Sequence, residues 1–108
     1  MNQKKLPEDK ATRASQPFQL VHSDLMGPFP TKSLGGASYV LTFIDDFGRM
    51  PFGYLLEHKD QTFDRFKNFK SLVENQSRFK IKMLRYDNGG EYNSNEFNDY
   101  YTKYGIKS

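Results

Sequence analysis

Cysteine and tryptophan are both absent from this chain of 108 residues, which has only two histidines. The lack of cysteine excludes disulfide bonds and zinc sites built on thiolates. The two histidines, His22 and His58, are well separated in the sequence and cannot hold a zinc ion alone. The composition therefore removes the disulfide-stabilised and zinc-binding classes of small domain.

Long apolar runs are missing as well. The longest are far shorter than the ~20 residues that a membrane-spanning helix needs, and the polar, charged N-terminus does not resemble a signal peptide. We therefore expect a soluble, intracellular chain without a membrane partner or a small-molecule substrate. Positive charges exceed negative ones only slightly, with a formal net charge of +3. This charge suits a polyanionic partner but does not demand one.

Aromatic residues are plentiful, at 16% of the chain, with ten Phe and seven Tyr. This content favours a packed globular domain over disorder, and the length allows one small domain. Residues 1–17 carry several basic residues and prolines with no apolar periodicity, which predicts a basic polar linker. A nucleic-acid-binding arm is the alternative for this segment. The folded domain is expected over residues 18–108.

Three strand candidates follow in quick succession, over residues 18–26, 38–45 and 51–57. Turn residues separate them, with glycines at 35–36 and the segment 47–49. Short turns between consecutive strands make an antiparallel meander the economical arrangement.

The apolar period then changes from that of a strand to that of a helix. Residues 60–76 have apolar side chains at helical spacing, with Asp60 as the expected N-cap. The apolar positions are Phe63, Phe66, Phe69, Leu72 and Val73. A strand over residues 80–87 follows, and a second helix is predicted between Ser94 as N-cap and Gly105 as stop. The last residues, 106–108, could begin another strand.

This order of elements predicts an α+β fold. A crossover through one helix should place the fourth strand parallel to the third, and such connections are strongly right-handed. If the fourth strand lies beside the first, the spatial order is 3-2-1-4. Asp24, near the end of the first strand, and Asp87, at the end of the fourth, then meet at one edge of the sheet, where ligand sites are favoured.

Carboxylates at neighbouring strand ends can share a hard divalent cation, because Mg²⁺ prefers oxygen ligands and usually takes only one or two carboxylates from the protein. Asp24 and Asp87 are therefore the candidate metal-binding and catalytic residues. The plain alternative is that each accepts backbone hydrogen bonds or forms a salt bridge. The paired placement favours a nucleic-acid-processing site, or most of one.

Three segments carry a family resemblance: residues 22–28 (HSDLMGP), 42–49 (TFIDDFGR) and 84–92 (LRYDNGGEY). Together they resemble the integrase catalytic core of copia-type (Ty1/copia) long-terminal-repeat retrotransposons, within the retroviral integrase superfamily. The match covers about residues 18–108. It implies a ribonuclease-H-like fold and an Asp, Asp, Glu triad that binds Mg²⁺ or Mn²⁺. It also implies DNA 3′-end processing and strand transfer, with DNA as partner, self-association of integrase and action in the nucleus.

Carried over by position, Asp24 corresponds to the first carboxylate of this triad and Asp87 to the second. The resemblance places the Glu on a later helix, so no position here inherits its role and the chain is expected to stop before it. Glu91 belongs to the turn after Asp87, and Glu96 suits the first turn of a helix. We therefore expect a fragment that is inactive alone. The alternatives are a non-catalytic remnant that binds nucleic acid or another integrase subunit, and a ribonuclease-H-type nuclease using other carboxylates.

The other polar residues near these motifs have ordinary interpretations. Asp45 and Asp46 are read as a turn cap or as ion-pair partners, with Arg49 as one such partner. A phospho-accepting receiver domain would need alternating strands and helices, which this order lacks. His22 is expected to be a buried, hydrogen-bonded side chain. Four lysines, at positions 80, 82, 103 and 107, could contact DNA phosphates or simply form a solvated basic face.

Overall fold

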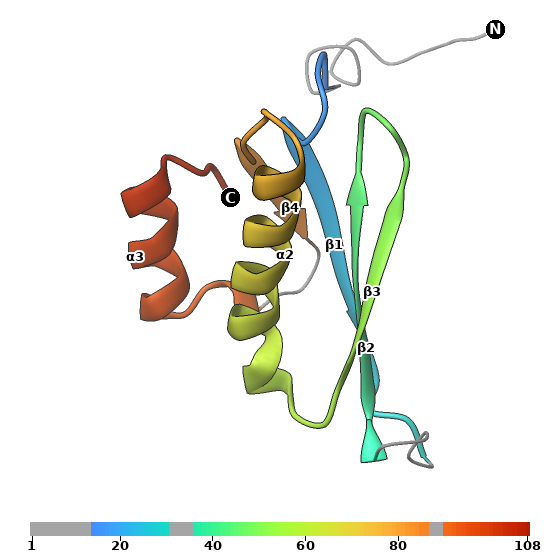
Figure 1. Cartoon of the computed structure of the whole chain (residues 1–108). Helices are drawn as coiled ribbons and strands as arrows, with labels where there is room; N and C mark the ends of the chain where they lie inside the picture. The colour runs from blue at the N-terminus through green and yellow to red at the C-terminus, as the bar shows by residue number, and fades with distance from the viewer. Residues whose placement is uncertain (1–13, 31–35, 87–89) are drawn as a thin grey trace, which may run out of the picture.

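The computed structural model describes residues 14–30, 36–86 and 90–108, and in them a mixed sheet carries two α-helices on one of its faces (Figure 1). The order along the chain is β1 (Leu20–Met26), β2 (Tyr39–Asp45), β3 (Pro51–Leu56), η2 (Lys59–Gln61), α2 (Thr62–Gln76), β4 (Met83–Tyr86), η3 (Gly90–Tyr92) and α3 (Asn95–Tyr104). This confirms the predicted order of strands and helices. The predicted linker at 1–17 falls largely outside the described residues. None of the helices described is long and apolar enough to cross a membrane.

The spatial order of the strands is β3-β2-β1-β4, as the sequence predicted. β1 runs antiparallel to β2 and parallel to β4, and β2 runs antiparallel to β3. The meander follows from short connections between β2 and β3, whereas the parallel β4 requires the long crossover through α2. The sheet therefore brings the carboxyl ends of β1 and β4 to the same edge.

β4 begins at Met83, three residues later than the strand predicted over residues 80–87, because the segment before it is bound differently. The backbone N–H of Ile81 donates to Glu74 Oε2 of α2 at 2.9 Å instead of entering the sheet ladder. On the outer side of β4, Leu84 donates to the carbonyl of Lys107 and Lys107 donates to that of Lys82, at 2.8 and 2.9 Å. An isolated parallel bridge between Met83 and Lys107 thus lies where the sequence suggested that a further strand could begin, at residues 106–108.

The two helices differ in how well the sequence predicted their first residues. A 3-10 turn over Lys59–Gln61 precedes α2, so Asp60 is not the N-cap that we expected. The Gln61 side chain organises this turn by accepting hydrogen bonds from the backbone of Glu57 and His58. In α3 the prediction is confirmed. Ser94 Oγ accepts from Phe97 N at 3.2 Å, and Gly105 ends the helix with φ of 68°.

Both helices lie against the same face of the sheet, which we call the covered face, and no described helix lies on the other, the open face (Figure 1). The strands supply both faces by alternation. In β2, Leu41 and Phe43 are fully buried under the helices, whereas Thr42 and Ile44 between them are only half-buried. The Phe43 ring stacks on Phe69 of α2 with 4.4 Å between centroids. The core is therefore the aromatic layer between the covered face and the helices.

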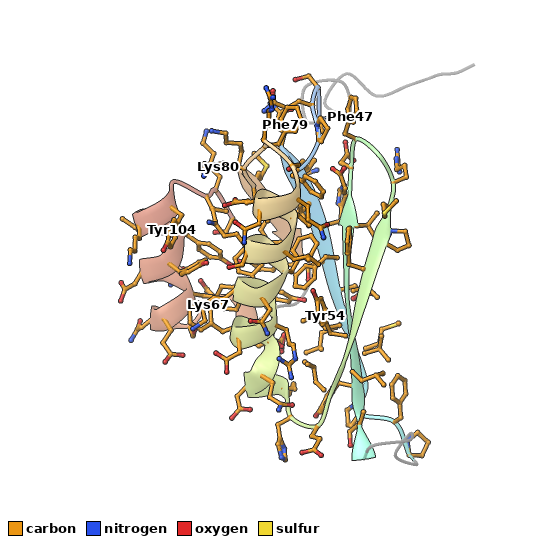
Figure 2. The ribbon with its side chains drawn as sticks, in the orientation of Figure 1. Phe47, Tyr54, Lys67, Phe79, Lys80 and Tyr104 are labelled. Atoms are coloured by element: carbon orange, nitrogen blue, oxygen red, sulfur yellow. The ribbon has the colours of Figure 1, made fainter. Side chains whose placement is uncertain are left out.

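A buried ion pair of α2 also contacts α3 and the segment just before β4. Lys70 Nζ lies 2.9 Å from Glu74 Oε1 within α2, and each side chain is only 10% exposed. The second oxygen of Glu74 accepts from Ile81, while Lys70 Nζ lies 4.0 Å from the centre of the Tyr104 ring of α3. Figure 2 shows Tyr104 on the helix outside α2. Both charges therefore have partners, as buried charges require.

Candidate metal and nucleic-acid site

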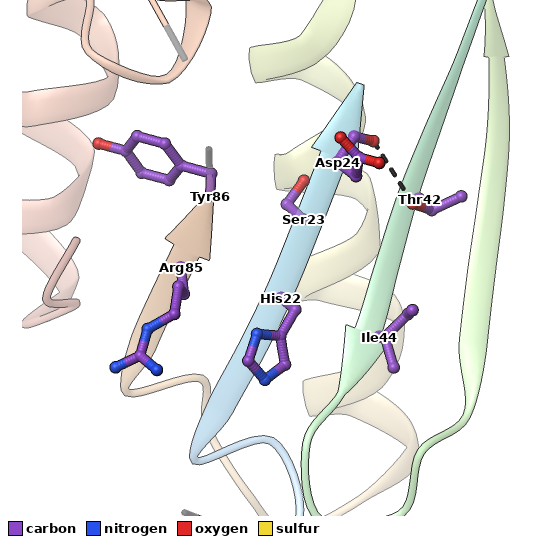
Figure 3. A pocket seen from close by; sticks show the side chains of 7 residues that line it. All are labelled: His22, Ser23, Asp24, Thr42, Ile44, Arg85 and Tyr86. Atoms are coloured by element: carbon purple, nitrogen blue, oxygen red, sulfur yellow. Dashed lines mark hydrogen bonds between the residues drawn. The ribbon is translucent and has the colours of Figure 1, made fainter. Parts of the chain in front are cut away.

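Asp24 is exposed near the carboxyl end of β1, with its side chain on the open face. Its backbone pairs with Thr42 of β2, whose Oγ1 donates to the Asp24 carbonyl at 3.4 Å (Figure 3). Among the residues that the structure describes, the Asp24 carboxylate has no hydrogen bond or ion pair. The plain interpretation of Asp24, a strand-end carboxylate already occupied by protein donors, therefore has no support in this part of the chain.

Asp87, the second predicted ligand, lies outside the described residues, so its position stays a prediction. The register of the neighbouring residues is described. Ser23, directly before Asp24, is the parallel partner of Tyr86, directly before Asp87. The two carboxylate positions thus follow directly after a pair of residues that are aligned in neighbouring strands. This register is what the predicted pairing of Asp24 with Asp87 requires.

A pocket of about 300 Å³ lies over β1 and its two neighbours (Figure 3). Its lining residues are His22, Ser23, Asp24, Thr42, Ile44, Arg85 and Tyr86. Arg85 of β4 is the parallel partner of His22, and both side chains lie farther from the strand ends than Asp24 does (Figure 3). Arg85 is exposed, and its one described polar contact is a weak approach of its guanidinium to Met83 Sδ at 4.0 Å. Arg85 was not predicted as a site residue, although it directly precedes Tyr86 and Asp87 in the third motif.

His22 is hydrogen-bonded, as predicted, but it is not buried. Its side chain is 38% exposed and its Nε2 lies 2.8 Å from Asp46 Oδ1. Burial of Asp46 tends to raise the pKa of that carboxyl. The hydrogen bonds from Ala14 N–H and His22, together with the charges of His22 and Arg49, outweigh burial and hold the pKa below its usual 3.8. His22 is thus oriented on the open face by a carboxylate that follows β2.

Asp45 acts as the turn cap that the sequence predicted. Its carboxylate accepts from the backbone N–H groups of Phe47 and Gly48, at 3.2 and 3.3 Å. It also accepts from Phe18 N at 3.0 Å, which the sequence did not foresee. Asp45 and Asp46 therefore hold the segment leading into β1, and neither is available as a metal ligand without losing these bonds.

Tyr92 was also missed as a residue near the site. It is 1% exposed, and its hydroxyl lies 2.8 Å from Ser23 Oγ. Its ring stacks on Tyr86, with 4.5 Å between centroids and 14° between planes. Burial, the main cause, raises the pKa of Tyr92 to about 12. The sequence did contain a sign of this contact at Ser23. Side chains alternate along β1, so a polar Ser23 next to Asp24 points toward the core and needs a hydrogen-bond partner there.

No group of three or more metal-ligating side chains occurs within the described residues. Glu91 is half-buried after the turn, and Glu96 is exposed in the first turn of α3, where the sequence placed it. The donor chemistry nevertheless fits a hard cation, because Asp24 presents an exposed carboxylate at a strand end. A complete ligand set requires Asp87 or groups from elsewhere.

Comparison with known proteins places these features in a family. The family model "Integrase core domain" matches residues 14–108. A retrovirus-related Pol polyprotein from transposon TNT 1-94 of Nicotiana tabacum is 49% identical over 90 residues, which are 83% of this chain and 7% of that polyprotein. The polyprotein from transposon RE2 of Arabidopsis thaliana is 37% identical over 103 residues, 94% of this chain and again 7% of the relative. The chain thus spans a small part of these relatives.

A solved structure shares the fold. The HTLV-2 integrase catalytic core domain, in a trimeric form with magnesium, superposes with a TM-score of 0.71 at 22% sequence identity. The match covers 88% of this chain and 60% of that one. This likeness supports the ribonuclease-H-like arrangement of the sheet and its flanking helices.

Proposed function

The chain belongs to the integrase core domain family, in its copia-type retrotransposon branch, and from this premise we propose that it forms part of a metal-dependent DNA strand-transfer site. Asp24 and Asp87 are the proposed ligands of Mg²⁺ or Mn²⁺. In the intact parent protein the proposed reaction is DNA 3′-end processing followed by strand transfer. Asp24 and Asp87 would hold the divalent cations, whose chemistry at such a site would be to activate water or a DNA 3′-hydroxyl and to stabilise the leaving oxygen of an in-line displacement.

One observation carries this proposal: Ser23 and Tyr86 are register partners in parallel strands. Each directly precedes a proposed ligand, so the backbone supports a close approach of the two carboxylates. An exposed Asp24 without a described protein partner supports it further. Paired carboxylates at adjacent strand ends are a recurring way to bind a hard cation beside a phosphate.

The remaining pocket residues have proposed roles on DNA. Arg85 is proposed to bind a backbone phosphate of DNA at this pocket, because its guanidinium offers a planar fork of donors and is exposed. His22 Nε2 donates to Asp46 Oδ1, so a second donor toward the same phosphate group, on Nδ1, exists only when the ring is doubly protonated and charged. Lys80, Lys82, Lys103 and Lys107 are exposed and remain candidates for outer phosphate contacts.

The 108 residues by themselves are proposed to be inactive. The resemblance implies a third carboxylate, a Glu on a later helix, and no position in this sequence matches it. Two carboxylates hold one cation loosely, and a second cation lacks an anchoring ligand. DNA ends and target DNA are the proposed partners, self-association with further integrase chains is proposed as well, and the nucleus is the proposed place of action.

A Mn²⁺ titration followed by electron paramagnetic resonance tests the metal site. We expect the wild-type chain to bind Mn²⁺ and expect Asp24→Asn and Asp87→Asn each to weaken binding at least tenfold, because each removes a charged oxygen ligand. Asp64→Asn is the matched control, since Asp64 is an exposed carboxylate on α2, on the other side of the sheet. It should leave the affinity unchanged.

Equal Mn²⁺ affinities of the Asp24→Asn and Asp64→Asn variants would contradict the proposal. DNA binding that is indifferent both to Mn²⁺ and to Asp24→Asn would favour the alternative, a non-catalytic nucleic-acid-binding remnant. Strand transfer by the purified chain with Mg²⁺ or Mn²⁺, abolished by Asp24→Asn, would show that the chain is active alone.

A further inference from the structure

We propose that Tyr92 is a positioning residue that joins the carboxyl ends of β1 and β4 and so sets where Asp24 presents its carboxylate. Its benefit to metal binding rests on the proposed function above, whereas the joining of the strands does not. Tyr92 lies in η3, outside the sheet, yet its side chain contacts the last residue of β4 and the residue before Asp24.

The hydroxyl of Tyr92 makes the contact with β1. It lies 2.8 Å from Ser23 Oγ, and both residues are buried, with exposures of 1% and 7%. Water therefore does not compete for this bond. Successive side chains of a strand point to opposite faces. Ser23 therefore holds the backbone from the covered face, and Asp24 projects from the same backbone to the open face. A rotation of β1 that moved the Asp24 carboxylate would break the Ser23–Tyr92 bond.

The ring of Tyr92 makes the contact with β4. It stacks on Tyr86 at 4.5 Å and 14°, a face-to-face contact that fixes the height of one ring over the other. Tyr86 is the parallel register partner of Ser23. A single side chain thus contacts both members of the last described pair between β1 and β4.

Tyr92 is itself held from α3. The hydroxyl of Tyr101 donates to the Tyr92 carbonyl at 2.9 Å, in a buried bond. Phe97 of α3 packs against the Tyr92 ring with 5.8 Å between centroids. The position of α3 is therefore transmitted to the ends of β1 and β4 through one residue that is held at both its backbone and its side chain.

The hydroxyl distinguishes positioning from simple packing. A phenylalanine at 92 would fill the same space and keep the stack on Tyr86, so apolar burial does not require the oxygen. Ser23 is likewise a buried polar residue, on a face that also carries apolar side chains such as Val21 and Leu84. The hydroxyl pair adds a direction to the contact, because a hydrogen bond constrains the angle as well as the distance.

Hydrogen exchange measured by NMR on the full 108-residue chain tests the proposal. Tyr92→Phe should speed amide exchange at least tenfold in residues 22–24 and 84–86, and Ser23→Ala should do the same. Amides in the β2–β3 pair should stay within twofold. Tyr54→Phe is the control, because Tyr54 is a half-buried tyrosine of β3 that contacts Phe43, away from the β1–β4 pair. It should change neither region.

The Mn²⁺ titration adds the functional arm. Tyr92→Phe should weaken Mn²⁺ binding at least threefold, by less than Asp24→Asn does, since it displaces the ligand without removing it. Faster local exchange with unchanged Mn²⁺ affinity would overturn the positioning role. Unchanged exchange, or exchange that rises equally across all strands, would overturn it as well. If the wild-type chain binds no Mn²⁺, the proposed metal site fails, and the exchange data still decide whether Tyr92 joins the strands.

Discussion

The two faces of the sheet are built from alternate residues of the same strands, and they differ in what covers them. On the covered face, Phe43, Leu41 and Val21 are fully buried in one core cluster with side chains of α2 and α3. The open face carries Asp24 and Arg85, both exposed, beside the pocket. One face therefore supplies the stability of the domain, and the other presents groups that can bind a ligand.

The difference teaches that neighbours in the sequence can have unrelated roles. Ser23 is buried and bonded to Tyr92, whereas Asp24 is exposed, and the two are separated only by the strand pleat. The chemistry of Asp24 on the open face depends on the packing of Ser23 on the covered face. Substitutions on the open face should therefore change binding with little loss of stability, whereas substitutions on the covered face should lower stability and, near Ser23, change binding as well.

The largest difference between the faces should come from Phe43 and its neighbour Ile44. Phe43→Ala is expected to lower the free energy of unfolding by about 3–5 kcal/mol, since it leaves a cavity against Phe69. Ile44→Ala, on the half-buried open face, should lower it by about 1 kcal/mol. Urea unfolding measures both. Equal losses would show that the open face is also packed in solution, for example by self-association.

The next largest effect should separate a buried ion pair from an exposed one. Glu74→Ala is expected to cost about 3 kcal/mol, because it leaves Lys70 and the Ile81 N–H without their partner beneath α3. The exposed i,i+3 pair of Lys67 with Asp64, 3.5 Å apart, gives the comparison. Asp64→Ala should change the unfolding free energy by less than about 0.5 kcal/mol. A cost for Glu74→Ala as small as that for Asp64→Ala would contradict the structural role of the buried pair.

A smaller and pH-dependent effect is expected at Asp46, which holds His22 on the open face. Its pKa is lowered in the folded chain, so the stability that its charge contributes is present above the unfolded value of 3.8. That contribution is lost as the pH falls through the folded pKa. Asp46→Asn should therefore cost about 1–2 kcal/mol at neutral pH, by loss of bonds to a charged acceptor. The gap to wild type should narrow in acid, which unfolding curves measured from neutral pH to about pH 3 will show. A gap that is constant with pH would be evidence against this role of the charge.

The smallest change in stability is expected at Arg85. Arg85→Ala should leave the unfolding free energy within about 0.5 kcal/mol, because the side chain is exposed. Under the proposed function, Arg85→Ala should weaken DNA binding. It should also reduce the slope of log K against log salt concentration by about 1, because one phosphate contact is lost. Fluorescence anisotropy with a DNA end at several salt concentrations measures both. An unchanged salt slope would remove Arg85 from the DNA contacts.

Local sequence patterns were sufficient to predict those elements whose structure depends on a single segment of the chain. The helical spacing of Phe66, Phe69 and Val73 predicted α2, and Ser94 with Gly105 predicted both ends of α3. The cap of α2 was mispredicted because the side chain of Gln61 stabilises a 3-10 turn that a spacing rule does not register. Errors of this kind are confined to the ends of elements, where a few hydrogen bonds choose between alternatives.

The sequence by itself determined the order of the elements, and it predicted the strand order 3-2-1-4 and Asp24 and Asp87 as candidate ligands, whereas the structure decided that β4 lies beside β1. The periodicity of side chains and the handedness of crossovers act through short-range sterics that every segment carries with it. Only the tertiary structure decided that Ser23 bonds Tyr92, 69 residues away, and that His22 bonds Asp46 across 24. Such contacts depend on the register and packing of separate elements. No local pattern encodes them, because the complete fold determines which side chains come within reach of each other.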